Sequence, residues 1–143
     1  MTTDARLKAL LEALAPGQVM WMSSSGKSLW PVILGGDSLR VLRCDEADLE
    51  EGDVAVVEAD SGALVAHVVV QRRPVRTASS NGRVDPPPRA VLGRVTAVRR
   101  GAVTVPLPRA SRRLLRALPV ASNVLRAVPG ATSVVRWLRD RRG

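Results

Sequence analysis

The sequence predicts a mainly β protein, with one helix before the β core and short helices after it. Short apolar runs that favour strands fill the middle of the chain, and glycine-containing turn signals separate them. The C-terminal part instead repeats proline-interrupted units typical of short helices. At 143 residues the chain is long enough for one domain with its own core. We therefore expect an N-terminal helix over 1–18, a β core over 19–105 and a basic amphipathic helical tail over 106–143.

The N-terminal segment has the pattern of a short amphipathic helix. Thr3 or Asp4 is expected to be its N-cap, because either side chain can accept a hydrogen bond from the first turn. Pro16 and Gly17 are expected to end it. The segment has no apolar stretch of the kind that secretory signals contain, so no signal peptide is expected. Its leucines are expected to share one face: Leu7, Leu10, Leu11 and Leu14.

Strands are predicted where apolar residues run or alternate between turn signals. The expected strands cover 19–22, 39–42, 54–58, 63–71, 91–98 and 102–105. Two of them, 54–58 and 63–71, are expected to form a hairpin around residues 60–62. The acidic stretch 44–52 is interpreted as a connector, and residues 72–88, which end in three prolines, as a loop.

The chain is basic, with 22 Lys and Arg residues against 13 Asp and Glu residues and a formal net charge of +9. Such a balance suits nucleic acid, an anionic membrane surface, or only solubility. No zinc-finger spacing and no aromatic RNA-binding motif accompanies the arginines. Residues 26–28, Gly-Lys-Ser, match the end of a phosphate-binding P-loop, but Trp21 occupies the place of its first glycine. We therefore expect no specific nucleic-acid or nucleotide ligand.

Cysteine and histidine usage argues against two further classes. Cys44 is the only cysteine, so the chain cannot close an intramolecular disulfide. One cysteine and one histidine are also too few for a zinc site made by protein ligands alone. Neither a metal nor a cofactor is expected.

The tail from residue 114 consists of three imperfect ten-residue units. Each unit has an arginine at its third position: Arg116, Arg126 and Arg136. A membrane-spanning helix is not expected, because Arg126 would lie near its centre, where insertion costs about 2.5–3.5 kcal/mol. Two interpretations remain open. The tail lies on an anionic membrane surface with these arginines toward the headgroups, or its helices pack on the β core with solvated arginines. Both predict a cytoplasmic or peripheral membrane protein.

A series of short motifs follows in the β core. They are Gly26-Lys27-Ser28-Leu29-Trp30-Pro31, Gly36-Asp37-Ser38-Leu39, Leu49-Glu50-Glu51-Gly52-Asp53-Val54, Ala66-His67-Val68-Val69, the segment from Thr77 to Asp85, and Leu92-Gly93-Arg94-Val95. In this order, over about half of the chain, they resemble the motifs of the type I signal peptidase superfamily, in its endoplasmic-reticulum-like branch.

The resemblance implies a signal-peptidase-like β core with an exposed substrate groove. It also implies a serine endopeptidase that cleaves a peptide or preprotein substrate after small side chains. Ser28 matches the nucleophile of the family, His67 matches the general base of the Ser/His branch, and Asp85 matches the acid that orients this base. The motif residues assigned to the oxyanion site and the substrate groove are Gly26, Leu29 and Pro31.

The residues themselves point to the same base. A serine hydroxyl is a weak nucleophile until a neighbouring base takes its proton. Lys8 belongs to the N-terminal helix, and Lys27 is adjacent to Ser28, so these two side chains would point to opposite faces of an extended chain. His67 is the only imidazole, and an imidazole has a reference pKa of about 6.5, which suits general-base catalysis.

An acid bonded to the other ring nitrogen of His67 would hold the imidazole in one tautomer and stabilise the imidazolium. Asp85 is the preferred acid, and Asp53 and Asp60 remain alternatives.

Several positions depart from the family pattern. Gly26 stands where many members have a hydroxyl that helps bind the oxyanion, Leu29 replaces a Met and Val68 replaces an Arg. Residues 80–82, Ser-Asn-Gly, replace Gly-Asp-Asn in the segment before Asp85. These departures favour an alternative: a catalytically degenerate relative that binds a peptide or partner protein in the same groove without cleaving it. A self-cleaving repressor is not expected, because it would need a Ser/Lys dyad and a DNA-binding helix-turn-helix before the core.

Overall fold

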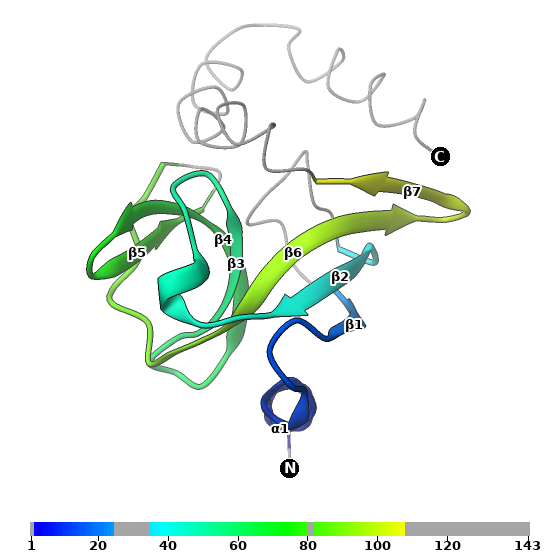
Figure 1. The fold of residues 1–143 in the computed structure, drawn as a ribbon, viewed down its shortest axis with the longest axis horizontal. Coiled ribbons are helices and arrows are strands. Elements are labelled where there is room, and N and C mark those ends of the chain that lie inside the picture. Colours follow the sequence, from blue (N-terminus) through cyan, green and yellow to red (C-terminus); the bar gives the residue numbers. More distant parts are fainter. Residues whose placement is uncertain (1, 25–34, 80–81, 108–143) are drawn as a thin grey trace, which may run out of the picture.

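The computed structural model describes residues 2–24, 35–79 and 82–107 (Figure 1). In chain order the elements are α1 (Thr3–Ala13), β1 (Val19–Ser23), β2 (Ser38–Arg43), the short 3-10 helix η1 (Glu46–Asp48), β3 (Val54–Glu58), β4 (Leu64–Arg72), β5 (Val75–Ala78), β6 (Ala90–Arg100) and β7 (Val103–Pro106). The mainly β class predicted from the sequence is confirmed. The helices predicted after residue 108 lie outside the described residues.

The strands form one antiparallel sheet in the order β1-β2-β6-β3-β4-β5, and β7 also pairs with β6. β6 joins the two halves of this sheet, because its first part pairs with β3 and its second part with β2 and β7. The register of β6 shifts against β2 between Arg40 and Val41, and against β3 between Val56 and Val57. Such irregularities increase local twist, and the sheet coils strongly around its inner face (Figure 1).

Alternate strand residues supply two apolar clusters, one on each face of the β3–β4 pair. The larger cluster lies on the inner face and contains Leu11, Leu39, Val41, Val54, Val56, Val68, Leu92, Val95 and Val98. The smaller cluster lies on the other face and contains Cys44, Leu49, Ala55, Val57, Val69 and Val75. The second cluster explains why β3 is buried along its whole length.

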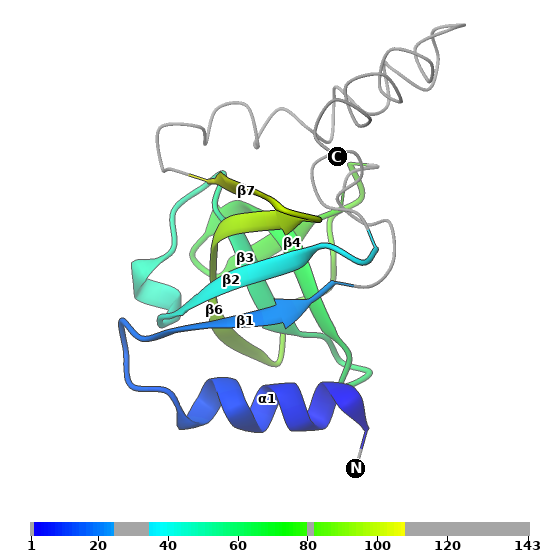
Figure 2. The same cartoon turned by 90° about the vertical axis from the view of Figure 1, so that its right-hand side faces the viewer.

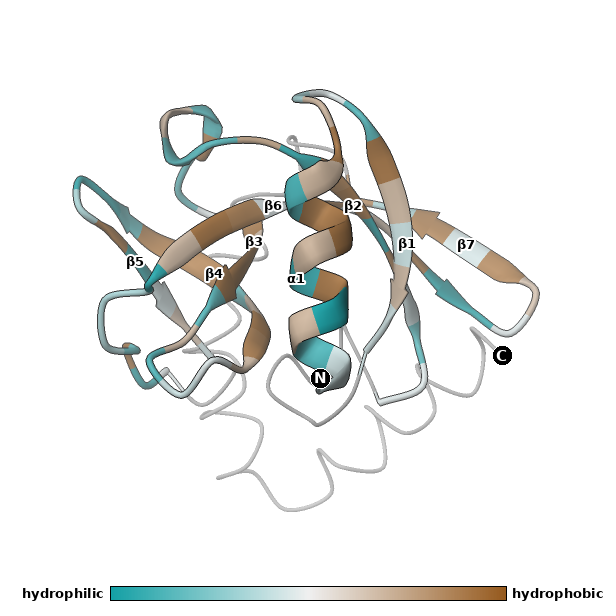
Figure 3. Ribbon diagram, turned by 90° about the horizontal axis from the view of Figure 1, so that it is seen from below, coloured by the Kyte–Doolittle hydropathy of each residue, from teal (hydrophilic) through white to brown (hydrophobic). Residues whose placement is uncertain are grey.

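α1 lies against the inner side of the coiled sheet (Figures 2 and 3). The predicted N-cap was wrong: the hydroxyl of Thr2 accepts the hydrogen bond, from the backbone N–H of Ala5 at 3.1 Å. Leu11 is fully buried and Leu14 packs against the inner cluster, whereas Leu10 is 55% exposed, so the predicted four-leucine face was wrong at Leu10. The helix turns by about 100° per residue, and its buried stripe passes through Leu11 and not through its neighbour.

Two polar contacts attach α1 to the β3–β4 hairpin. A carboxylate oxygen of Asp4 accepts the backbone N–H of Leu64 at 3.1 Å. The ammonium of Lys8 lies 2.6 Å from Oε2 of Glu58, at the end of β3. The helix is thereby fixed to a hairpin that is distant from it in the sequence.

The segment 72–88 is not the loop that the sequence predicts. β5 lies within it and pairs with β4, with Val68 opposite Ala78 and Val69 opposite Thr77. An isolated bridge between Ala78 and Val84 then brings the chain back along β5. The hydrogen bonds that β5 exchanges with β4 stabilise the extended conformation, despite the arginines and prolines around it.

The turn before β2 is held by a buried ion pair. Asp37 is 2% exposed, and its two carboxylate oxygens accept hydrogen bonds from Nε and Nη2 of Arg100, both at 2.8 Å. The hydrogen bond with Asp37 raises the pKa of the Arg100 guanidinium. This two-point contact ties the start of β2 to the end of β6.

Candidate active site

His67 lies in the middle of β4, on the face opposite the main core. Strand alternation directs Ala66 and Val68 to the inner cluster and places His67 on the same face as Val65. Its directly opposite neighbour on β3 is Ala55, whose small side chain leaves room for the imidazole ring. Only 7% of the His67 surface is exposed, so its ring nitrogens need partners within the protein.

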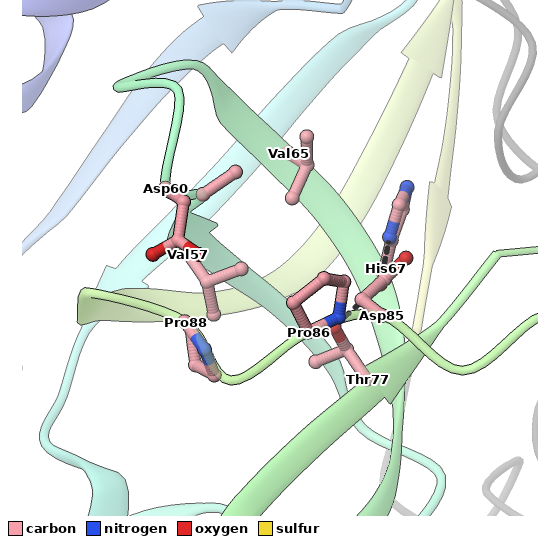
Figure 4. Close-up of a pocket in the computed structure, with 9 residues that line it drawn as sticks. Val57, Asp60, Val65, His67, Thr77, Asp85, Pro86 and Pro88 are labelled. Atoms are coloured by element: carbon pink, nitrogen blue, oxygen red, sulfur yellow. Dashed lines mark hydrogen bonds and ion pairs between the residues drawn. The ribbon is translucent and has the colours of Figure 1, made fainter.

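One of these partners is Asp85. Nδ1 of His67 lies 2.5 Å from Oδ2 of Asp85 (Figure 4). An ionised carboxylate can only accept a hydrogen bond, so the ring hydrogen belongs on Nδ1 and the lone pair on Nε2. The contact therefore selects the tautomer in which Nε2 is the basic atom.

Asp85 is itself held from two neighbouring residues of β5. The hydroxyl of Thr77, a residue that is 1% exposed, donates to Oδ2 of Asp85 at 2.7 Å. The backbone N–H of Asp85 donates to the carbonyl of Thr77 at 2.8 Å. The guanidinium of Arg76 donates to the carbonyl of Asp85 through Nε at 3.0 Å and Nη2 at 2.7 Å. The position of the carboxylate is thus fixed through both its side chain and its backbone.

Thr77 and Arg76 were missed in the sequence analysis, because the segment around them was assigned to a loop. A signal was present. The β-branched residues Val75 and Thr77 alternate with Arg76 and Ala78, which is the period of a short strand.

The second ring nitrogen of His67 is uncommitted within the described ranges. Nε2 is buried and has no hydrogen-bond partner among residues 2–24, 35–79 and 82–107. Buried polar atoms are nearly always bonded, so a basic nitrogen in this state is a site at which a proton can be accepted.

The two alternative acids have other places. Oδ2 of Asp53 accepts the backbone N–H of Glu50 at 2.8 Å, and its carbonyl accepts the N–H of Val69 at 2.8 Å, so Asp53 organises the turn before β3. Asp60 lies in the β3–β4 turn. The acid that His67 contacts is Asp85.

Four predicted site residues lie outside the described part of the chain: Gly26, Ser28, Leu29 and Pro31. The two ends of the connection that contains them are joined. The N–H of Ser24 donates to the carbonyl of Asp37 at 2.7 Å, and the N–H of Gly36 donates to the carbonyl of Ser24 at 2.9 Å. Residues 25–34 therefore leave and re-enter the described structure at the end of the β1–β2 pair.

Lys8 is unsuited to act as a base. Its hydrogen bond to Glu58 raises the pKa of the ammonium, which keeps the group protonated. Lys27, the other lysine of the chain, lies outside the described residues. Within the described ranges the basic atom next to an orienting acid is Nε2 of His67.

A pocket of about 100 Å³ adjoins the His67–Asp85 pair. Its walls are aliphatic and come from Val57, Ala59, Val65, Pro86 and Pro88. Figure 4 shows His67 and Asp85 at one end of this pocket and Asp60 at the other.

Other kinds of site are not found in the described ranges. They contain no group of three or more His, Cys, Asp or Glu side chains that could hold a metal ion. In the same ranges no helix is long and apolar enough to cross a membrane. Cys44 is 6% exposed, and burial raises the pKa of its thiol. The tail arginines Arg116, Arg126 and Arg136 lie outside the described residues.

The described part of the site is thus a buried imidazole whose tautomer is set by a carboxylate, next to an aliphatic pocket. Neither the protein-family models nor the curated proteins contain a match to this chain.

Proposed function

We propose that the protein is a serine endopeptidase of the signal-peptidase type, with Ser28 as nucleophile, His67 as general base and Asp85 as the acid that orients the base. The observation that carries this proposal is the 2.5 Å contact between Nδ1 of His67 and Oδ2 of Asp85. It leaves Nε2 as the basic atom, without a partner among the described residues. The motif around Ser28 supplies the nucleophile in this proposal.

In the proposed reaction the Oγ of Ser28 attacks the carbonyl carbon of the scissile peptide bond while Nε2 of His67 takes its proton. The Asp85 carboxylate stabilises the imidazolium, which then gives the proton to the leaving amine as the C–N bond breaks. The product of this step is an acyl ester on Ser28. Water then attacks the ester carbonyl while His67 takes a proton from the water. His67 gives this proton to Oγ of Ser28 as the ester C–O bond breaks, which releases the acid product.

Asp85 suits an orienting role better than a catalytic one. Its Oδ2 receives hydrogen bonds from both Nδ1 of His67 and the hydroxyl of Thr77. An oxygen that already accepts two hydrogen bonds is less available to take a proton from the substrate. The free basic position therefore belongs to His67.

The test uses the full chain and fluorogenic peptides that carry small residues at the cleavage position. Ser28→Ala and His67→Ala should each remove nearly all activity, and the double variant should be hardly worse, because the two residues act as one unit. Asp85→Asn should lower the rate strongly but less completely. Lys27→Ala is the matched control, since it changes the residue next to Ser28 and should leave turnover largely intact. Activity that survives His67→Ala would refute the assignment.

The degenerate peptide-binding relative is favoured instead by one specific difference, the glycine at position 26 in place of an oxyanion-binding hydroxyl. It predicts saturable peptide binding by the wild-type protein with no cleavage and no reaction of Ser28 with a fluorophosphonate. Loss of an oxyanion donor costs roughly 10²–10³ in rate, so slow turnover above background would still support the peptidase.

A further inference from the structure

We propose that the pocket beside His67 and Asp85 binds a lysine or arginine side chain of the peptide substrate, with Asp60 binding its cationic head. This inference rests on the proposed function in one respect: the ligand is the peptide that the same site would cleave. The proposed function includes only a preference for small residues at the cleavage position. The present inference adds a preference for a positively charged residue at a neighbouring position of the substrate.

The pocket is placed to contact a residue close to the reacting bond. His67, Thr77 and Asp85 line one end of it, so the acid–base pair forms part of its wall (Figure 4). Val57 and Val65 are a directly opposed cross-strand pair of β3 and β4. A peptide whose carbonyl lies at His67 therefore has a neighbouring side chain within reach of this pocket.

The size and walls of the pocket suit one unbranched aliphatic stem. Cavities of about 150 Å³ take up a benzene molecule, so about 100 Å³ corresponds to a single side chain. Between the His67 end and the Asp60 end, the walls come from valine, alanine and proline residues. Lysine and arginine bury their methylene groups against such surfaces while the charged head stays near polar groups or water.

Asp60 gives the far end of the pocket its charge. Its carboxylate has no ion pair and no hydrogen-bond partner in the part of the chain that the structure describes. Two backbone hydrogen bonds stabilise the turn around Asp60. The N–H of Gly62 donates to the carbonyl of Ala59 at 2.8 Å, and the N–H of Ala59 donates to the carbonyl of Ala63 at 2.9 Å. An exposed carboxylate at the end of an aliphatic pocket is complementary to a lysine or arginine side chain.

Arg89 is a cation near this end, but its contacts are with other groups. Its Nη1 donates to the backbone carbonyl of Asp60 at 3.3 Å and lies 3.8 Å from Oε1 of Glu58. Its charge should weaken the attraction between Asp60 and a basic ligand without replacing that ligand. Removal of the Asp60 charge and removal of the Arg89 charge should therefore change the preference in opposite directions.

The experiment measures binding, so that it does not depend on cleavage. Full-length protein carrying Ser28→Ala is titrated with fluorescein-labelled peptides in which lysine or norleucine is placed at each position in turn around a small-residue cleavage site. Norleucine has the aliphatic stem without the charge. At one position we expect the lysine peptide to bind about fivefold more tightly, the upper range for a solvent-accessible ion pair. The ratio should fall with added salt.

Asp60→Asn should bring the lysine-to-norleucine ratio to about one, and Arg89→Gln should raise it above the starting ratio. Thermal unfolding of each variant checks that the fold is intact. The proposal is overturned if no position prefers lysine, if the preference persists in Asp60→Asn, or if no peptide binds saturably. If the lysine peptide binds more tightly but the wild-type protein never cleaves, the peptidase is refuted and the pocket is supported. If the protein cleaves but shows no preference for lysine, the pocket is refuted and the peptidase is supported.

Discussion

His67 and Thr77 bond to the same oxygen atom of Asp85. Nδ1 of His67 reaches Oδ2 from β4 at 2.5 Å, and the hydroxyl of Thr77 reaches it from β5 at 2.7 Å. Rotation of the carboxylate would break both contacts at once. Thr77 therefore holds in place the carboxylate that contacts His67, the proposed base.

Thr77→Val removes this hydroxyl with little change in shape. We expect kcat to fall about tenfold, because a hydrogen bond to a charged acceptor contributes about 1.5 kcal/mol. Thr77→Ser, which keeps the hydroxyl, should restore the rate. Urea unfolding of both variants measures any loss of stability. A lower rate that follows a loss of stability and is not restored by Thr77→Ser would mean that Thr77 acts only through stability.

Gly93 should tolerate no side chain. It lies on β6 opposite Arg43 of β2 and Val56 of β3, and a Cβ built on it would lie 2.5 Å from the carbonyl oxygen of Leu42. Because that neighbour is backbone, Gly93→Ala should destabilise the protein by about 1–3 kcal/mol, which urea unfolding measures. Gly101→Ala is the comparison, since its turn has open space around the Cβ but a φ of +57°. An equal or smaller loss at Gly93 than at Gly101 would contradict this account of the β2–β6 contact.

Cys44 should make stability fall at alkaline pH. Burial raises the pKa of its thiol, so the folded state retains the proton at pH values where the unfolded chain has lost it. This contribution is fully present below the unfolded-state pKa of about 8.5 and is lost as pH rises through the folded-state pKa. Urea unfolding between pH 7.5 and 10 should therefore show a steeper decline for wild type than for Cys44→Ala. Parallel declines would show that this thiol is not the cause.

The tail arginines should attach the protein to anionic lipid. We expect the full chain to sediment with phosphatidylserine-containing vesicles and to be released by salt, because surface charge is screened within about 10 Å at 0.1 M. Changing Arg116, Arg126 and Arg136 together to Gln should abolish binding. The control changes Arg6 of α1 together with Arg72 and Arg73 at the end of β4. All three are exposed, and the change removes the same charge from outside the tail. Equal losses in the two triple variants would show that only net charge matters.

The strands of the core could be predicted because their local pattern and their final environment agree. The hairpin of β3 and β4 has valine-rich runs around a glycine turn, and the structure pairs Val54 with Val68. β5 was harder to predict, because Pro74 and the arginines around it are typical of a loop. In the structure, pairing with β4 overrides that local preference. Leu10 was misplaced because four leucines near one another fit a broad helical face, and only docking shows which stripe is buried.

The site was predictable in part. His67 stood out because it is the single imidazole of the chain, and composition alone isolates it. Its acid needed the motif resemblance, since nothing local ranks Asp85 above Asp53 or Asp60. Asp85 is distinguished from the other two carboxylates only by the Ala78–Val84 bridge, which brings the chain back beside β5 and places Asp85 against His67. The role of Ser28 remains a prediction.

β6 also determines the order in which the chain can fold during synthesis. α1 leaves the ribosome first, yet the backbone N–H that Asp4 accepts belongs to a residue 60 positions later. Neither β2 nor β3 has its central neighbour until residues 90–100 have emerged. Until then the two hairpins and the apolar face of the helix have no β6 to pack against. Their apolar side chains stay accessible to chaperones and to other nascent chains. A ribosome stalled before Ala90 would therefore hold an aggregation-prone fragment, and only translation through β6 makes it a domain.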